Sequence, residues 1–329
     1  MINDEIGTRM KHHYEEIPKI RLVRRTPVCI RLDGKAFHTF TRGLKRPFDD
    51  ILIHTMQDAV KYLCEHIQGA VFGYTQSDEI SLLLVDYKKL NSDAWFDYEV
   101  QKMCSISASM ATLAFCQNFS RRVREYEAET DSLSGQESGK LLPEEEAYRR
   151  TLLRALEKGA LFDARCFNIP KEEAANLLYW RQLDARRNSI LMVGQAHFSA
   201  KQLHKKSCRN IQEMLAEDGI IWEDLPVHKK YGSCCVKTQQ EAEKTVWFID
   251  EEIPVFKDDR IILSSGFMWE RTISNGSLCN RRHTRKLPEN HRVRTGTLSG
   301  RPRYGHRSRR FRVRLGRFYG RSTSAGLSE

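Results

Sequence analysis

The sequence predicts an α+β fold of the ferredoxin-like type, with its elements in the order strand, helix, strand, strand, helix, strand (βαββαβ). The observations behind it are short apolar runs rich in strand-forming residues at 27–33, 69–74, 79–85 and 161–167, and helix-like segments at 48–67 and 100–122. In this topology the first strand lies beside the hairpin of the second and third strands. We therefore expect the ends of these strands to meet at one end of the sheet.

Each element has its own local signal. The first strand, 27–33, stops at an Asp33-Gly34 turn. From 48 to 67 apolar residues recur every three or four positions, which indicates an amphipathic helix, and Asp49 and Asp50 in its first turn favour the helix dipole. The strands at 69–74 and 79–85 are joined by a turn that contains Gln76, Ser77 and Asp78, and the helix at 100–122 is rich in Ser and Ala.

The sequence divides into three parts. Residues 1–168 are the predicted catalytic domain, with an acidic, Ser- and Gly-containing segment at about 125–146 that we interpret as a solvated linker or insertion. Residues 169–265 are a module that is helical over 170–217, where Pro170 and following acids favour a helix start, and has small strands at 232–237 and 245–249. Residues 266–329 form an Arg-rich tail with few large apolar residues, which predicts disorder.

The positive charge belongs to the tail. The chain has 54 Lys and Arg against 43 Asp and Glu, a formal charge of +11, but sixteen of the bases and two of the acids follow residue 270. The first 270 residues therefore hold 38 bases and 41 acids. The basic character is thus not a property of the predicted fold.

Composition and motifs exclude several classes. The sequence contains no run of eighteen apolar residues, so no membrane span is predicted. The N-terminus lacks the basic and apolar regions of a secretory signal. The nine cysteines are odd in number, lie mostly inside apolar runs and form no CxxC pair, which is typical of reduced core thiols rather than of zinc or redox sites. We expect a cytoplasmic protein without a membrane partner.

Two aspartates stand where strands end beside a small residue, Asp33 before Gly34 and Asp78 after Ser77. Carboxylates brought this close would repel, and one would stay protonated unless a cation were shared between them. Oxygen ligands of this kind suit Mg²⁺ bridged to substrate phosphates. The pair therefore predicts phosphoryl or nucleotidyl transfer.

A set of ordered motifs resembles the tRNA(His) guanylyltransferase superfamily over residues 7–260. The motifs are Arg31-Leu32-Asp33-Gly34-Lys35, Arg46-Pro47-Phe48-Asp49 and Gln76-Ser77-Asp78-Glu79, followed by Asp163-Ala164-Arg165, Trp180-Arg181-Gln182, Arg187-Asn188-Ser189-Ile190 and Gln195-Ala196-His197-Phe198. The later segments are similar to the guanylyltransferase-like branch of that superfamily. Several motifs in order are far more specific than any one of them.

The resemblance implies a polymerase-type palm run in reverse, which adds GTP or templated nucleotides in the 3′ to 5′ direction at the 5′ end of a tRNA. A 5′-monophosphate is first adenylylated with ATP, then the 3′-hydroxyl of the incoming nucleotide attacks and AMP leaves. By this likeness Asp33, Asp78 and the carbonyl of Gly34 hold two Mg²⁺ ions. It also implies a homotetramer.

The resemblance further implies which residues bind the substrates. Backbone amides from Lys35 to His38, and Ser77, would contact the nucleotide, and further family positions near its triphosphate and base fall on Arg46, Asp49 and Lys102. The implied nucleotide site is Asp33, Gly34, Lys35, Ala36, Phe37, His38, Arg46, Asp49, Ser77, Asp78 and Lys102. The implied RNA contacts are Arg181, Arg187 and Asn188.

One departure bears on the substrate. Where eukaryotic tRNA(His) enzymes have a His-Ile-Asn-Asn-Leu-Tyr-Asn run, this chain has Arg186-Arg187-Asn188-Ser189-Ile190-Leu191. This favours repair of 5′-truncated tRNAs over obligatory tRNA(His) maturation.

Other interpretations stay open. Asp33 and Asp78 are also compatible with a turn and a cap, His38 with a core histidine, Lys102 and Arg46 with solvated charges, and Arg181 and Arg187 with a salt-bridge ladder through Asp184. The tail is either an RNA contact or a spurious segment. At the level of function, the alternatives are a non-catalytic RNA-binding protein on the same scaffold and a nucleotide cyclase.

Overall fold

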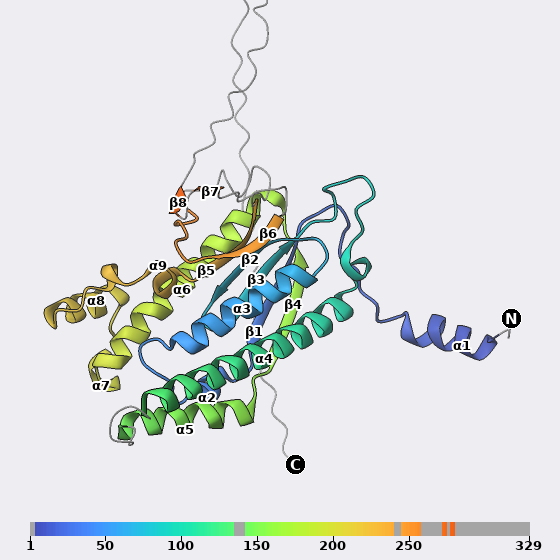
Figure 1. Cartoon of the computed structure of the whole chain (residues 1–329). Helices are drawn as coiled ribbons and strands as arrows, with labels where there is room; N and C mark the ends of the chain where they lie inside the picture. Colours follow the sequence, from blue (N-terminus) through green and yellow to red (C-terminus); the bar gives the residue numbers. More distant parts are fainter. Residues whose placement is uncertain (1–3, 135–141, 240–244, 258–271, 275–276, 280–329) are drawn as a thin grey trace, which may run out of the picture. The chain divides into compact units, whose positions relative to one another are not determined.

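The computed structural model describes residues 4–134, 142–239, 245–257, 272–274 and 277–279. Its centre is a six-stranded antiparallel sheet in the order β4-β1-β3-β2-β5-β6 (Figure 1). The strands are β1 (Val28–Gly34), β2 (Ala70–Gln76), β3 (Glu79–Leu84), β4 (Phe162–Asn168), β5 (Ser233–Gln239) and β6 (Thr245–Asp250).

The first four strands confirm the predicted fold class. Helix α3 (Asp50–His66) joins β1 to β2, and α4 (Val100–Ser134) leads from β3 towards β4. The order β4-β1-β3-β2, with every neighbouring pair antiparallel, is the ferredoxin-like arrangement. β1 therefore lies at the centre of this part of the sheet, between β3 and β4.

The two faces of the sheet bury different helices. Val28, Ile30 and Leu32 of β1 belong to the cluster that packs on α3 and α4, whereas Cys29 packs with residues of α6 (Ala174–His197). Figure 1 shows α3 and α4 on one side of the sheet and α6 on the other. Because side chains alternate along a strand, Arg31 and Asp33 share the α6 side with Cys29.

The prediction of a linker at 125–146 was wrong at both ends of the segment, which are helical. α4 continues to Ser134, and a further helix, α5, runs over Pro143–Lys158, while 135–141 lie outside the described residues. Pro143 and the three acids 144–146 start α5, and Arg149 pairs with Glu127 and Asp131 of α4. The acids that we interpreted as a sign of solvation are thus helix-start and ion-pair residues.

The module after β4 joins the same sheet. β5 pairs with β2, with Cys235 opposite Gly73, and β6 pairs with β5. The boundary predicted after residue 168 therefore crosses a continuous sheet. The predicted helical segment contains α6, α7 (Ala200–Leu203) and α8 (Cys208–Glu217), followed by α9 (Val227–Tyr231).

The remaining described elements are short. They are α1 (Glu5–Met10), a π-helical turn (Lys11–Glu15), α2 (Phe37–Phe40), three 3-10 helices (Trp95–Tyr98, Lys171–Glu173 and Trp222–Asp224) and a hairpin of β7 (Thr272–Ser274) and β8 (Ser277–Cys279). Apart from that hairpin, the predicted disordered tail lies outside the described residues. None of the helices in the described ranges is long and apolar enough to cross a membrane. The eight cysteines between residues 29 and 235 are free thiols.

Candidate active site

The ends of β1 and of the β2–β3 hairpin meet, as the topology predicts. Asp33 lies directly opposite Glu79 of β3 and Asp163 of β4. Asp78 lies in the tight turn between β2 and β3, and its backbone carbonyl accepts a 3.1 Å hydrogen bond from the amide of Gly34. Four carboxyl groups therefore gather around one corner of the sheet.

Two of these four carboxylates have basic partners. Glu79 faces Nη1 of Arg181 at 2.7 and 2.9 Å and Nε of Arg31 at 3.5 Å. Asp163 is exposed and pairs with Arg165 at 3.0 Å. Within the described part of the chain, neither Asp33 nor Asp78 forms an ion pair with a basic side chain. Their negative charges are therefore the uncompensated ones at this corner.

The surroundings raise the pKa of both aspartates. Burial first, and then the negative charges of Asp78, Glu79 and Asp163, raise the pKa of Asp33, while Arg31 acts against this. Burial also raises the pKa of Asp78, against the 2.9 Å hydrogen bond that the Ser77 hydroxyl donates to its carboxylate. The ionised pair is therefore costly unless a cation lies between the two groups.

The oxygen donors at this corner suit Mg²⁺ that is shared with a substrate better than they suit a metal ion whose ligands all come from the protein. The described residues contain no group of three or more His, Cys, Asp or Glu placed to hold a metal ion. Mg²⁺ ordinarily takes one or two carboxylates and completes its octahedron with water and substrate phosphates. Asp33, Asp78 and the Gly34 carbonyl match that pattern.

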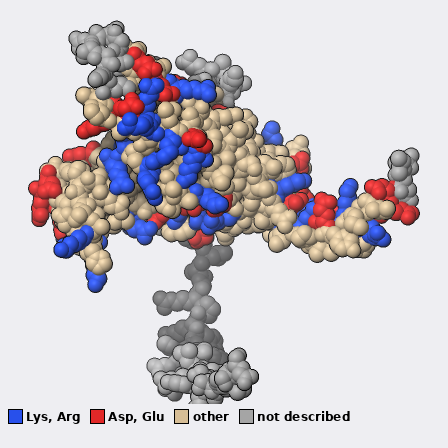
Figure 2. Space-filling model, turned by 90° about the horizontal axis from the view of Figure 1, so that it is seen from below, with Lys and Arg blue, Asp and Glu red and all other residues tan. Residues whose placement is uncertain are grey.

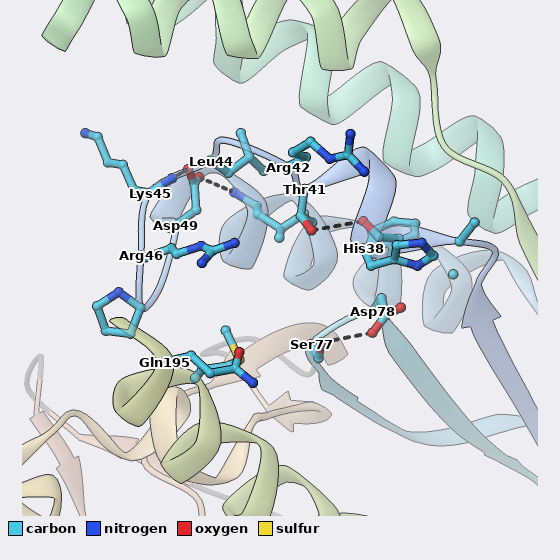
Figure 3. Close-up of a pocket in the computed structure, with 16 residues that line it drawn as sticks. His38, Thr41, Arg42, Leu44, Lys45, Arg46, Asp49, Ser77, Asp78 and Gln195 are labelled. Atoms are coloured by element: carbon cyan, nitrogen blue, oxygen red, sulfur yellow. Dashed lines mark hydrogen bonds between the residues drawn. The ribbon is translucent and has the colours of Figure 1, made fainter. Parts of the chain in front are cut away.

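A cavity of about 580 Å³ opens beside Asp78 (Figure 3). Asp78, Ser77 and His38 lie on one side of the cavity, and Lys45, Arg46 and Asp49, from the loop just before α3, lie on the other. The described lining is Gly34, Ala36, Phe37, His38, Thr41, Arg42, Leu44, Lys45, Arg46, Pro47, Asp49, Leu52, Ser77, Asp78, Met192 and Gln195. The volume is that of an ordinary small-molecule site.

The chain after β1 bends tightly to form this cavity. Ala36 has a left-handed backbone conformation with φ +53°, which turns the chain into α2. A side chain on Gly34 would place its Cβ 2.2 Å from the Phe37 ring, so only glycine fits there. Eight of the predicted nucleotide-site residues line the cavity: Gly34, Ala36, Phe37, His38, Arg46, Asp49, Ser77 and Asp78.

Lys35 does not line the cavity. Its backbone amide donates a 2.8 Å hydrogen bond to the carbonyl of Leu161, at the start of β4. The predicted contact of this amide with a nucleotide is therefore wrong for the arrangement seen here, because the donor is already used to join β1 to β4. The side chain of Lys35 is exposed.

Asp49 holds the cavity wall in place through hydrogen bonds. Its buried carboxylate accepts hydrogen bonds from the amides of Leu52 and Lys45 at 3.1 and 3.0 Å and from the Tyr148 hydroxyl at 2.7 Å. It therefore caps α3 and fixes the preceding loop to α5. Its predicted contact with a nucleotide stays a prediction.

Lys102 does not line this cavity, and its predicted place beside the nucleotide stays a prediction. It is exposed near the start of α4, with its ammonium 5.7 Å from the centre of the Phe96 ring. The start of α4 lies beside Cys166, which pairs with Ile30, three residues before Asp33. α4 reaches the Asp33 end of the sheet only at Thr112, whose hydroxyl is 3.3 Å from the amide of Phe162.

The predicted RNA contacts separate into two kinds. Arg181 is 5% exposed and bound to Glu79, so its predicted place on an RNA surface is wrong. Arg187 is exposed and pairs with Asp184 at 2.9 Å, and Asp184 also lies 3.7 Å from Arg181, as the alternative of a salt-bridge ladder predicts. RNA contact by Arg187 and the half-buried Asn188 stays a prediction.

Sequence reasoning missed several residues of the wall. Arg42 and Lys45 were not among the predicted site residues, and we did not expect α5 at all. Its signal was present, because Pro143 and three acids precede the buried Tyr148, Leu152 and Ala155. The contribution of Met192 and Gln195, from the end of α6, depends on long-range packing that no local pattern reveals.

Comparison with known proteins agrees with this geometry. The family model described as tRNAHis guanylyltransferase matches residues 7–170. A solved bacterial tRNA(His) guanylyltransferase-like protein in complex with ATP is 37% identical, with 80% of this chain and 99% of that chain covered and a TM-score of 0.64. A solved bacterial protein of the same description, in complex with GTP, is 36% identical, with 81% of this chain and 100% of that chain covered and a TM-score of 0.62.

A relative from Dictyostelium discoideum, described as a probable tRNA(His) guanylyltransferase, is 26% identical over 238 residues, which are 68% of this chain and 80% of that protein. The matched segment of the family model contains both Asp33 and Asp78. A bacterial relative matched over nearly its whole length at more than one third identity, together with that model, shows that this chain belongs to the tRNA(His) guanylyltransferase family, whose members are nucleotidyltransferases.

Proposed function

We propose that this chain is a Mg²⁺-dependent nucleotidyltransferase that adds GTP, or templated nucleotides, to the 5′ end of tRNA in the 3′ to 5′ direction. The observation that carries the proposal is the corner of Asp33 and Asp78, two carboxylates without basic partners among the described residues, where Asp78 and the neighbouring Gly34 line a cavity together with Arg42, Lys45 and Arg46. Solved relatives that are 37% and 36% identical are complexes with ATP and with GTP.

The chain supplies binding and orientation at this corner. Asp33, Asp78 and the Gly34 carbonyl would hold two Mg²⁺ ions, which neutralise the charge that develops on the attacking and leaving oxygens. Gly34 lets a phosphate approach the backbone closely, since it has no Cβ. Arg46 points into the cavity from the side opposite Asp78, and Arg42 also lines it, so that cations are present to attract a polyphosphate (Figure 3).

Two nucleotide reactions fit one such site. In the scheme that the family resemblance suggests, the RNA 5′-monophosphate attacks the α-phosphate of ATP and pyrophosphate leaves. The 3′-hydroxyl of GTP then attacks the RNA 5′-phosphate with release of AMP. Both steps are in-line displacements at a phosphorus atom, so the same carboxylates serve both. The role is repair of 5′-truncated tRNAs or tRNA(His) maturation, in a cytoplasmic homotetramer.

The test is to incubate the wild-type protein with Mg²⁺, ATP, labelled GTP and a tRNA that lacks its first nucleotide and carries a 5′-monophosphate. The proposal predicts label at the RNA 5′ end, dependence on ATP, and no need for ATP when the tRNA carries a 5′-triphosphate. Label at the 3′ end would contradict the direction of synthesis.

Two further outcomes decide between the alternatives. A cyclic nucleotide formed without tRNA would identify a cyclase. Tight tRNA binding with no incorporation under any of these conditions would favour the non-catalytic RNA-binding protein.

A further inference from the structure

Basic side chains gather where the cavity wall meets α5. Figure 2 views the molecule from the side on which α5 and α2 lie in Figure 1, and Lys and Arg side chains cluster on that face. We define the basic rim as the exposed residues Lys35, Arg42, Lys45, Arg46, Arg154 and Lys158. Arg42, Lys45 and Arg46 also line the cavity.

The rim differs from its neighbours in having no acidic partners. In the part of the chain that the structure describes, no carboxylate lies within 4 Å of a rim ammonium or guanidinium. Nearby, Arg149 pairs with Glu127 and Asp131, Arg150 with Glu146, and Arg165 with Asp163. The charge of the rim is therefore available to an external anion.

Contacts of α5 hold the rim against the cavity. The guanidinium of Arg154 donates a hydrogen bond to the carbonyl of Arg42, and the Tyr148 hydroxyl donates to Asp49 at 2.7 Å. The ammonium of Lys45 lies 4.5 Å from the centre of the Tyr148 ring, a cation–π contact. The rim thus continues without a break from the cavity wall onto α5.

The end of α5 extends the rim outwards. Lys158 lies one turn after Arg154, about 6 Å further along the helix axis. Three residues beyond Lys158, the carbonyl of Leu161 binds the amide of Lys35. Cations therefore border the cavity on the side of α5 and also extend beyond the reach of a single nucleotide.

We propose that the basic rim binds the phosphate backbone of the polynucleotide substrate and guides its end into the cavity. This inference rests on the proposed function, since that function supplies an RNA whose 5′ end must reach Asp33 and Asp78. Successive phosphates match a row of unpaired cations, and such contacts position a nucleic acid without reading its sequence. Arg154 and Lys158 do not line the cavity, so they serve RNA and not the bound nucleotide.

The experiment compares tRNA binding at several salt concentrations by the wild-type protein and by the variant Arg154→Gln/Lys158→Gln. The slope of log Kobs against log salt is negative, and each lost phosphate contact makes it less steep by about 0.7 to 0.9. The slope of the double variant should therefore be about 1.6 less steep, and its affinity for tRNA about 20-fold lower at 0.15 M salt. The Kd for GTP without RNA should stay unchanged.

Two controls separate charge from structure. Arg154→Lys/Lys158→Arg keeps both charges and should keep the wild-type slope. Arg209→Gln removes one exposed charge from α8, where Arg209 pairs with Glu213, and should leave RNA binding unchanged. Lys158→Gln alone breaks no contact of the described chain and should make the slope about 0.8 less steep.

The outcomes distinguish this inference from the proposed function. tRNA binding without nucleotide transfer would refute the function, while the slopes would still test the rim. An unchanged slope in the double variant, a weakened Kd for GTP instead, or no tRNA binding by the wild-type protein at 50 mM salt would each overturn the inference. Retention of phosphatidylserine vesicles but not of tRNA by the same residues would also overturn it.

Discussion

Replacing Arg181 by Met should destabilise the protein strongly without an intrinsic effect on RNA affinity. The Arg181 side chain is 7% exposed, and its Nη1 lies 2.7 and 2.9 Å from the two carboxylate oxygens of Glu79, whose side chain is 12% exposed. Removing one partner of a buried ion pair typically costs about 3–5 kcal/mol, because the remaining charge is left buried without its partner. Because both groups are buried, the loss of stability should be larger than for a surface ion pair, which typically contributes less than about 1 kcal/mol.

The contacts that Glu79 keeps place the expected loss at the lower end of this range. Arg31 still faces it at 3.5 Å and the Gln76 amide at 2.6 Å. We therefore expect about 3 kcal/mol, which corresponds to about 6–12 °C in Tm for a chain of this size. The double variant Arg181→Met/Glu79→Gln should recover part of this loss, since it removes the carboxylate that has lost Arg181, while Arg31 still faces the glutamine oxygen in its place.

Thermal and urea unfolding of the three proteins measure this effect. Arg187→Met is the matched control on the same helix, because Arg187 is 62% exposed and its pair with Asp184 should contribute less than about 1 kcal/mol. A folded Arg181→Met protein with unchanged Tm and a lower salt slope for tRNA would refute the reasoning. That result would place Arg181 on the RNA surface after all.

Three further predictions concern this corner and the cavity wall beside it. Gly34→Ala should cost about 1–3 kcal/mol in urea unfolding, since the new Cβ would lie 2.2 Å from an aromatic ring, and an unchanged midpoint would contradict the packing. Tyr148→Phe removes the donor to the buried Asp49 and should cost about 1.5–3 kcal/mol, whereas a loss below about 0.5 kcal/mol would show that the loop is held otherwise. The pKa of Asp33 is raised above its ordinary value of 3.8, so the folded chain binds more protons than the unfolded chain, and in EDTA wild-type stability should fall relative to Asp33→Asn as pH rises from 4 to 7. A difference in Tm that does not change with pH would contradict this cause.

The central site was predictable from sequence because its signals are local. The run before Asp33 and the turn at Ser77 and Asp78 mark strand ends, and the ferredoxin-like order places those ends together. The sequence also showed that the two aspartates would lie together. It did not show which neighbouring carboxylates would be neutralised, since Glu79 meets Arg181 from 102 residues away.

The errors arose where local chemistry was ambiguous. Acids at 144–146 are typical of a helix start as well as of a solvated segment, and only the pairing of Arg149 with α4 decides between the two. For Lys102, whose predicted contact stays untested, the helix was correctly predicted, but its distance from Asp33 depends on where along the sheet that helix begins. The pairing of β5 with β2 required knowledge of which sheet edge was free.

The most direct test of the central claim measures Mg²⁺-dependent transfer of labelled GTP to the tRNA 5′ end by four proteins: wild type, Asp33→Asn, Asp78→Asn and Asp163→Asn. Asp163 is the matched control, because it lies opposite Asp33 on β4 but is exposed and already paired with Arg165. We expect activity in wild type and Asp163→Asn alone, with all four proteins folded. Full activity in Asp33→Asn or Asp78→Asn would contradict the assignment of this corner as the catalytic metal site.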